Sequence, residues 1–359
     1  MSSPSVALVH DFLVQMGGAE KVLEALHELY PQAPIYTSVY DPAVMPAEYR
    51  SWDIRTSSLQ HWPARGKLHR TMLPFYPMAF EGFDLSAYDL VISSSSAFAK
   101  GVITLPHTRH VCYMHAPMRY VWMTDTYLKG ERVGRFRRLL TPMLHYLRLW
   151  DQVSASRVDT YVANSTAVQQ RIAKFYRREA IVVPPPVDTS RFAVSEVRGD
   201  YYIAVSRFVP YKRMDMAVDA MTRLGRPLKI VGTGRQAAEL KRRAGPTVEF
   251  LGWVDNARLP ELVANARAFL MPGEEDFGIA PVEANAAGRP VIAYAAGGAL
   301  DTQVDGVTGV LFAPQTVEAL CAAVERFEGL TFDHAAIGRH ARQFDTEQFK
   351  SRIRAVIES

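Results

Sequence analysis

Short runs of apolar, often β-branched residues alternate with amphipathic stretches of helical period along almost the whole chain. This alternation restricts the fold more than any other feature, because strand, crossover helix and strand form the repeating unit of a parallel sheet. The expected strands of the first half are Val6–His10, Leu90–Ser94, His110–His115, Thr160–Asn164 and Ile181–Val183. Those of the second half are Tyr202–Ser206, Leu228–Val231, Val248–Leu251, Ala268–Met271, Val291–Ala293 and Gly309–Phe312. The sequence therefore predicts an α/β protein with two doubly wound parallel sheets.

Two domains are expected, because 359 residues are more than one hydrophobic core usually organises. Three prolines, Pro184 to Pro186, end a strand, and the irregular stretch after them is predicted as a linker near residues 186–199. The predicted bounds are 1–186 for the first domain and 200–335 for the second. Helices over 336–359 are expected to pack back on the first domain, since "TEQFKSRIRAVIE" is amphipathic.

The composition indicates a soluble globular protein, with 48% apolar and 22% charged residues and no run of eighteen uncharged apolar residues. The start, "MSSPSVALVHDF", lacks the basic and long apolar regions of an export signal, so a cytoplasmic location is expected. Cys112 and Cys321 stand far apart in apolar contexts and are predicted as buried thiols of a reducing compartment. The formal charge of +4 is too small to indicate a nucleic-acid partner.

The first predicted strand is followed by a glycine pair and a helix, in "VHDFLVQMGGAEKVLEAL". Gly17 and Gly18 precede a helix expected to begin at Ala19, whose terminal backbone amides can receive an anionic group such as a diphosphate. A plain connecting turn explains the glycines equally well. The third glycine of a dinucleotide-binding fingerprint is absent, so this segment indicates a dehydrogenase only weakly.

A second group of polar residues follows the strands of the second half. Arg207 comes just after one strand and Lys212 near the start of the next helix, so both cations can face a phosphate at the carboxyl edge of the sheet. Gly232 ends the next strand in "KIVGTG", and Trp253 and Val254 follow the strand after that, where a ring or a backbone amide can meet a base. The alternatives are a solvated pair of surface charges and a tryptophan of the core.

These motifs, in this order, resemble the retaining glycosyltransferases of family 4, which have the GT-B fold of two Rossmann-like domains facing each other across a cleft. The resemblance continues through "GEEDFGIAPVEANAAGRPVIAY" and Gly297–Gly298, and in the first half through "CYMHAPMRYVW", "VANST" and "VVPPPVD". Within the family, "EDFGI" and "HAPMRYVW" are most similar to mannosyl- and rhamnosyl-type enzymes of bacterial exopolysaccharide and O-antigen assembly, especially users of GDP-mannose.

The resemblance implies roles for the acidic segment. It assigns Glu275 to the donor sugar and Glu283 to the ribose, from a loop and from the first turn of a helix expected to begin near Ala280. Glu274 competes with Glu275 but lacks the family spacing to Glu283, and Asp276 stands where many relatives have glycine. The backbone amides expected to reach the sugar belong to Phe277, Gly278 and Ile279.

The chemistry expected of such a site is stabilisation of a leaving diphosphate. Arg207 and Lys212 supply positive charge, and since no DxD-like acidic pair follows a strand, metal independence and no cofactor are predicted. By the resemblance, His115 faces the reacting sugar and Ser165 lies near the diphosphate or the acceptor. From the residues alone, a core histidine and a helix N-cap serine are the alternatives. The side chains predicted to be catalytic are His115, Arg207, Lys212 and Glu275.

The acceptor side is predicted from two segments, 58–83 and 127–140, that mix basic with aromatic and aliphatic residues. Basic side chains attract anionic head groups and aromatic ones insert at the interface, which suits a lipid-linked saccharide presented at the inner face of the cell membrane. A solvated basic face is the alternative. The residues assigned to this surface are Arg65, Lys67, Arg70, Arg135, Arg137 and Arg138.

The sequence thus favours a peripheral enzyme of exopolysaccharide or lipopolysaccharide synthesis that moves a hexose, expected to be mannose from GDP-mannose. Two other functions remain open within the GT-B fold. A nucleotide-sugar epimerase would not need the pair of Glu275 and Glu283. A non-catalytic partner subunit would have lost the charged residues, all of which are present.

Overall fold

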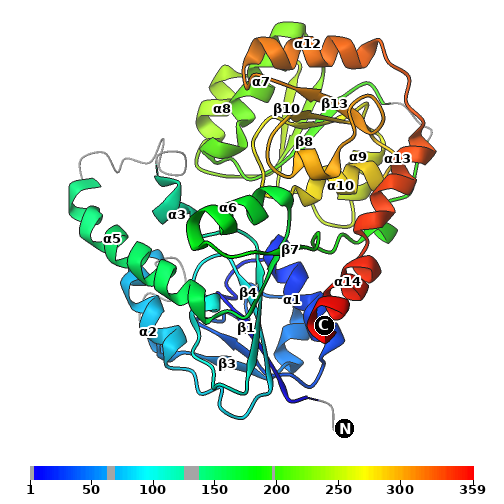
Figure 1. The fold of residues 1–359 in the computed structure, drawn as a ribbon. Coiled ribbons are helices and arrows are strands. Elements are labelled where there is room, and N and C mark those ends of the chain that lie inside the picture. The colour runs from blue at the N-terminus through cyan, green and yellow to red at the C-terminus, as the bar shows by residue number, and fades with distance from the viewer. Residues whose placement is uncertain (1–3, 63–68, 125–136, 196–198) are drawn as a thin grey trace. The chain divides into compact units, whose positions relative to one another are not determined.

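The computed structural model describes residues 4–62, 69–124, 137–195 and 199–359, and the chain divides into two compact units. Unit 1 comprises Met1–Pro186 with Phe349–Ser359, and unit 2 comprises Val187–Gln348 (Figure 1). Each unit is built on its own parallel sheet with helices packed against it.

Unit 1 contains a seven-stranded parallel sheet in the order β3-β2-β1-β4-β5-β6-β7. Its strands are β1 (Val6–His10), β2 (Ile35–Thr37), β3 (Ile54–Thr56), β4 (Leu90–Ser95), β5 (Arg109–Met114), β6 (Thr160–Ala163) and β7 (Ile181–Val182). Successive residues of β1 enter different cores, since Leu8 packs on one face of the sheet and Ala7 and Val9 on the other. A sheet covered on both faces explains why its central strands β1, β4 and β5 are buried along almost their whole length.

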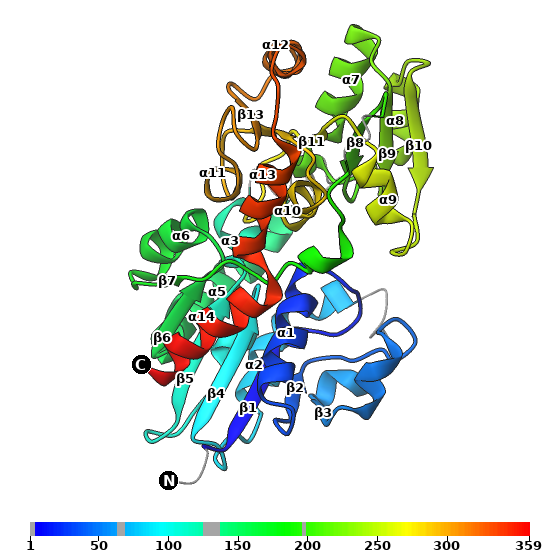
Figure 2. The same cartoon turned by 90° about the vertical axis from the view of Figure 1, so that its right-hand side faces the viewer.

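The helices of unit 1 cover both faces of this sheet. They are α1 (Gly18–Leu29), α2 (Tyr76–Glu81), α3 (Arg119–Trp122), α5 (Arg137–Ser154), α6 (Thr166–Tyr176) and α14 (Thr346–Glu358), with 3₁₀ turns η1 (Ala47–Ser51), η2 (Ser58–His61), η3 (His69–Phe75), η4 (Ala99–Gly101) and η5 (Ala155–Arg157). Helix α14 packs beside α1 (Figure 2), where Phe349 and Ile353 join the core that holds Leu23. The guanidinium of Arg109 donates to the carbonyl of Ile357 at 2.6 Å, which ties the end of the chain to the sheet.

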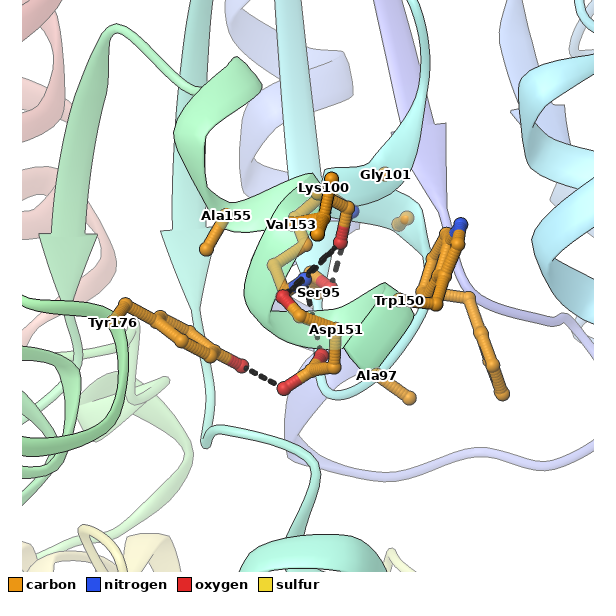
Figure 3. Close-up of polar contacts among 12 residues, drawn as sticks. Ser95, Ala97, Lys100, Gly101, Trp150, Asp151, Val153, Ala155 and Tyr176 are labelled. Atoms are coloured by element: carbon orange, nitrogen blue, oxygen red, sulfur yellow. Dashed lines mark hydrogen bonds and ion pairs between the residues drawn. The ribbon is translucent and has the colours of Figure 1, made fainter. Parts of the chain in front are cut away.

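A buried ion pair joins the helices of unit 1 (Figure 3). Lys100 Nζ lies 3.0 Å from Asp151 Oδ1, and both side chains are fully buried. The same ammonium donates to Ser154 Oγ at 2.6 Å, while the other carboxylate oxygen accepts from Trp122 Nε1 at 2.6 Å and from the Tyr176 hydroxyl at 2.9 Å. The pair therefore connects η4, α5, α3 and α6 through one cluster of hydrogen bonds.

Unit 2 contains a six-stranded parallel sheet in the order β10-β9-β8-β11-β12-β13. Its strands are β8 (Tyr202–Val205), β9 (Leu228–Val231), β10 (Val248–Gly252), β11 (Phe269–Met271), β12 (Val291–Tyr294) and β13 (Gly309–Phe312). Its helices are α7 (Met214–Leu224), α8 (Ala237–Arg243), α9 (Leu259–Ala264), α10 (Ile279–Ala286), α11 (Ala299–Thr302), α12 (Val317–Glu328) and α13 (His334–Ala341), with η6 (Thr189–Arg191), η7 (Pro210–Lys212) and η8 (Arg342–Phe344).

The predicted fold class is confirmed, and every predicted strand exists with ends that differ by at most one residue. Strands β2 and β3 were not predicted, because three residues are too few to show a period. The segment 336–359 is divided between the units. Ile337 and Phe344 are buried in the cores of unit 2, and only the residues from Phe349 onward pack in unit 1.

Candidate functional site

The loops that leave the carboxyl ends of the strands in unit 2 carry most of the predicted donor-binding residues. Arg207 and Lys212 follow β8, Gly232 follows β9, and Glu275 follows β11. Because all strands of this sheet are parallel, these loops emerge at one edge, and ligands of open α/β sheets bind at that edge.

Three glycines let these loops touch backbone to backbone. A Cβ on Gly273 would lie 2.7 Å from the Cα of Lys212, and one on Gly297 would lie 2.1 Å from the carbonyl oxygen of Glu275. The amide of Gly298 donates to that same carbonyl at 2.9 Å. The loop that carries Glu275 is therefore held between two others, and no larger residue fits at either glycine without displacing backbone.

This packing brings two of the predicted site residues together. Lys212 Nζ forms a hydrogen-bonded ion pair with Glu275 Oε1, and each side chain is 18% exposed. The ammonium also lies 5.4 Å from the ring centroid of Tyr211, whose hydroxyl is 3.5 Å from Arg207 Nη2. Arg207, Lys212 and Glu275 thus form one charged group at the sheet edge, in which Arg207 is exposed and Tyr211 contacts both cations.

The start of α10 has a backbone conformation that lets a ligand approach closely, and its role in donor recognition stays a prediction. Gly278 caps this helix with φ of +91°, a conformation that favours glycine. The side chain of Phe277 is buried in the core of unit 2, so only its backbone faces the edge. The helix begins at Ile279, one residue earlier than predicted, and Glu283 is therefore in its second turn, half-buried.

Three further predicted residues of this edge, Gly232, Trp253 and Val254, differ in their packing and exposure. A Cβ on Gly232 would lie 1.9 Å from the carbonyl oxygen of Ser206, so the turn after β9 packs directly on the loop that carries Arg207. Trp253 is 75% exposed, which makes the alternative of a core tryptophan wrong. Val254 packs partly buried against the core.

In unit 1, the glycine pair lies at the start of α1. Gly17 is the N-cap and the helix begins at Gly18, one residue earlier than predicted. The first turn contains the buried carboxylate of Glu20, and a Cβ on Gly17 would lie 3.2 Å from its Oε2. The N-terminus of this helix therefore already has the Glu20 carboxyl group beside it, and contact with a diphosphate there stays a prediction.

His115 directly follows β5 and is half-buried. Its Nε2 lies 2.8 Å from Ser94 Oγ, and its carbonyl accepts from Asn164 Nδ2 at 3.0 Å. Burial, and then the neighbouring His10, lower the pKa of His115 to about 3. The imidazole is therefore neutral at physiological pH and serves as a hydrogen-bonding group, not as a proton carrier.

Ser165 has the structural role that its sequence position offered as an alternative. It is the N-cap of α6, and its buried hydroxyl accepts from the amide of Val168 at 3.2 Å and donates to Asn164 Oδ1 at 3.1 Å. Both of these hydrogen bonds are made within the protein, and contact with a substrate stays a prediction.

The predicted basic surface is only partly covered by the structure. Arg65, Lys67 and Arg135 lie outside the described residues, while Arg70 is in η3 and Arg137 and Arg138 begin α5, without described side chains. Within the described ranges, no helix is long and apolar enough to cross a membrane. Nor does any group of three His, Cys, Asp or Glu side chains in those ranges have the arrangement of a metal site. Cys112 and Cys321 are unpaired and buried, as predicted.

The buried polar side chains that lead from His115 into unit 1 were not predicted from the sequence. Ser94 is the last residue but one of β4, His10 ends β1, and Glu20 lies in the first turn of α1, all three buried. One signal was available: polar residues at the carboxyl ends of apolar strands, in "VALVH" and "LVISSSS". The strand order β1-β4-β5, which makes these ends neighbours, could not be predicted from the sequence.

Comparison with known proteins agrees with this architecture. A profile described as Glycosyltransferase Family 4 matches residues 16–191, and one described as Glycosyl transferases group 1 matches residues 188–344. The GDP-mannose-dependent alpha-(1-6)-phosphatidylinositol monomannoside mannosyltransferase of Mycolicibacterium smegmatis is 26% identical over 97% of this chain and 95% of its own length. The glycogen synthase of Mycobacterium tuberculosis is 29% identical over 59% of this chain and 54% of its own length.

Solved structures show the same fold at low identity. Anabaena HepE in complex with UDP matches with a TM-score of 0.73 over 99% of both chains at 19% identity. WaaG, a glycosyltransferase involved in lipopolysaccharide biosynthesis, matches with a TM-score of 0.66 over 98% of this chain and 99% of its own at 16% identity. With two glycosyltransferase profiles matched in succession on two parallel-sheet units, the chain belongs to the glycosyltransferases of GT-B type, with a family 4 first half and a group 1 second half.

Proposed function

We propose that this glycosyltransferase moves a sugar from a nucleotide-sugar donor to a hydroxyl of its acceptor, with retention of anomeric configuration and without a metal ion. The observation that carries the proposal is the charged group of Arg207, Lys212 and Glu275 at the carboxyl edge of unit 2. A nucleotide sugar has a dianionic diphosphate next to a neutral, hydroxyl-rich ring. Two cations beside one carboxylate match that distribution of charge.

The geometry suits stabilisation of the leaving group. Negative charge grows on the diphosphate as the bond to the anomeric carbon breaks, and preorganised cations stabilise it. Arg207 is exposed at this edge, and Lys212 is fixed by its contact with Glu275, so the ammonium does not need to be ordered when the donor arrives. Glu275 then accepts hydrogen bonds from sugar hydroxyls, which an anionic oxygen receives more strongly than a neutral one does.

For the donor we propose GDP-mannose. The support is the mannosyltransferase of Mycolicibacterium smegmatis, a GDP-mannose-dependent protein similar over nearly the whole chain. The solved relatives in complex with UDP and UDP-glucose make a UDP-sugar the competing donor. The exposed ring of Trp253, one residue past β10 at the same sheet edge, is the side chain we assign to contact the base.

For the acceptor we propose a lipid-linked saccharide at an anionic membrane surface, in exopolysaccharide or lipopolysaccharide synthesis. Helix α5 supports this, because three large apolar side chains on one face are 44% (Tyr146), 54% (Leu149) and 61% (Val153) exposed. Two arginines open this helix, and its single acidic residue, Asp151, is buried. A basic helix with an exposed apolar stripe is suited to lie at a lipid interface.

The test is transfer from a panel of nucleotide sugars, GDP-mannose and UDP-glucose among them, to lipid-linked acceptors in vesicles with and without anionic lipid. We expect GDP-mannose to give the fastest transfer, an α-linked product by NMR, full activity in EDTA, and stronger binding to the anionic vesicles. Interconversion of the free nucleotide sugars without transfer would instead show an epimerase. Loss of activity in EDTA that Mg²⁺ or Mn²⁺ restores would contradict metal independence.

A further inference from the structure

A row of polar side chains runs inward from His115 to a buried carboxylate in unit 1. His115 Nε2 lies 2.8 Å from Ser94 Oγ, and that hydroxyl lies 3.1 Å from His10 Nδ1. His10 Nε2 in turn lies 3.6 Å from Glu20 Oε1. His10 and Glu20 are each 2% exposed and Ser94 is fully buried, so His115 is the one member of the row that reaches the surface of the unit.

The hydroxyl of Ser94 links the states of the two imidazoles. It has a single proton, which it can donate to only one of the two ring nitrogens that face it. If the proton goes to His10, then Ser94 Oγ is left to accept from His115, and His115 must have its own proton on Nε2. If the proton goes to His115 instead, His115 must have its proton on Nδ1.

Glu20 decides between these two arrangements. A carboxylate accepts protons and does not donate them, so Glu20 Oε1 favours a proton on His10 Nε2, which lies 3.6 Å away in an ion-pair contact longer than a hydrogen bond. A neutral His10 then has a bare Nδ1, which accepts from the Ser94 hydroxyl.

We propose that Glu20, acting through His10 and Ser94, is a positioning residue that fixes His115 as the Nε2–H tautomer, so that Nδ1 presents a lone pair to a substrate hydroxyl. Among the described residues, Nδ1 of His115 has no hydrogen-bond partner. Burial keeps the pKa of His115 low, so the ring stays neutral and the tautomer alone determines what it offers. The proposal rests on the proposed function for the identity of the ligand, a sugar hydroxyl.

The order Glu20, His10, Ser94 resembles that of a hydrolytic triad, yet it does not make Ser94 a nucleophile. An activated serine needs an accessible oxygen, and this one is fully buried with an imidazole on each side. The row of hydrogen bonds therefore determines which ring nitrogen of His115 has the proton.

The experiment is NMR of histidine-¹⁵N-labelled protein at pH 7.5, in which long-range ¹H–¹⁵N correlations report the tautomer of each ring. His115 is assigned by the signals that His115→Gln removes. We expect the wild-type ring to be Nε2–H, with Nδ1 at the position of a bare nitrogen. In Glu20→Met, the Nδ1 resonance should move toward its N–H position as the two tautomers mix. We expect kcat to fall about 10- to 100-fold with a smaller change in KM, by analogy with the loss seen when the outer partners of metal-binding histidines are removed.

Ser93→Ala is the matched control. Ser93 is also fully buried on β4, and its hydroxyl lies 2.8 Å from Nε2 of another histidine, His110. It should lose stability as Ser94→Ala does but leave the His115 signals and kcat unchanged, whereas Ser94→Ala should shift both. If Glu20→Met does not fold, Ser94→Ala measures the same link.

An Nδ1–H tautomer in the wild type, or His115 signals that are the same in the folded variants as in the wild type, would overturn the proposal. The tautomer is measured without substrate. Failure of the wild type to transfer any sugar would therefore contradict the proposed function and leave the NMR result to stand by itself.

Discussion

Two lysine–carboxylate pairs, one in each unit, differ in where the fold places them. Lys100 and Asp151 are both fully buried, and the ammonium also donates to Ser154 Oγ at 2.6 Å and to the carbonyl of Asp151 at 2.9 Å. Lys212 and Glu275 are each 18% exposed, at the edge where the loops after β8 and β11 meet. The first pair is enclosed by partners, and the second is partly open to a ligand.

The difference shows that an ion pair takes its role from its surroundings. A buried charge that loses its partner has no water to replace it, so the first pair is essential to the fold once it is present. In the second pair each group can exchange its partner for solvent or for a ligand at low cost. Lys212 can therefore contact a diphosphate from the position in which Glu275 holds it, whereas Lys100 is closed off from any ligand.

The largest effect is expected from Lys100→Met. The substitution keeps the apolar stem but leaves the Asp151 carboxylate buried without its countercharge, which should lower the free energy of unfolding by about 3–5 kcal/mol. Urea unfolding followed by tryptophan fluorescence measures the change. The control is Lys21→Met, which removes a pair in unit 1 whose lysine is 52% exposed and should cost less than about 1 kcal/mol. Equal losses in the two variants would remove the contrast between buried and open pairs.

Lys212→Ala should reduce kcat about 10²-fold, roughly 3 kcal/mol, because one preorganised contact to developing charge is lost. Steady-state kinetics give the value, with the donor that the panel of nucleotide sugars selects. Lys241→Ala, which removes an exposed lysine of α8, serves as the control and should leave kcat unchanged. A raised KM with unchanged kcat would show that Lys212 binds the donor equally in the ground state and the transition state.

Whether each of the two ion pairs could be predicted depends on whether its signal lies in a short stretch of sequence. Arg207 and Lys212 stand five positions apart beside a strand, and the glycines at 273, 297 and 298 mark loops that touch, so the open pair was within reach of a sequence prediction. Lys100 appears in "AFAKG" as an ordinary surface lysine. Its partner is 51 residues away, and only the packing of η4 against α5 makes burial possible.

Around His115, too, the features that were predicted are local in the sequence and those that were not predicted depend on the strand order. His115 itself stood out as a polar residue at the end of a strand within a recognisable segment. Its link to Ser94 and His10 depends on β1, β4 and β5 lying side by side, an order that periodicity does not contain. For Trp253, hydrophobicity offered a core position as the alternative, but the ring is exposed just after β10.

Lys212→Arg tests whether the open pair needs a point charge. Arginine keeps the positive charge but spreads it over a planar fork, so its donors lie at other positions than those of an ammonium. We expect kcat between those of the wild type and Lys212→Ala, with about a tenfold loss, or 1.4 kcal/mol. Full activity in Lys212→Arg would show that charge alone matters at this position.

The smallest effect is expected for the stability of Glu275→Gln. The glutamine keeps the volume and one oxygen acceptor, and the Lys212 ammonium that it leaves behind is partly solvated, so the free energy of unfolding should change by less than about 1 kcal/mol. Urea unfolding followed by far-UV circular dichroism provides the measurement, and Glu239→Gln, on the exposed face of α8, is the control.

A loss of 3 kcal/mol or more, as in a buried pair, would mean that Lys212 and Glu275 hold the loops after β8 and β11 together. The partial exposure of both side chains would then be no guide to function, and the distinction between a structural and a functional pair would fail for this protein. A small loss together with a strong decrease in transfer would place the energy of this contact in substrate binding and turnover, as the position of the pair at the sheet edge predicts.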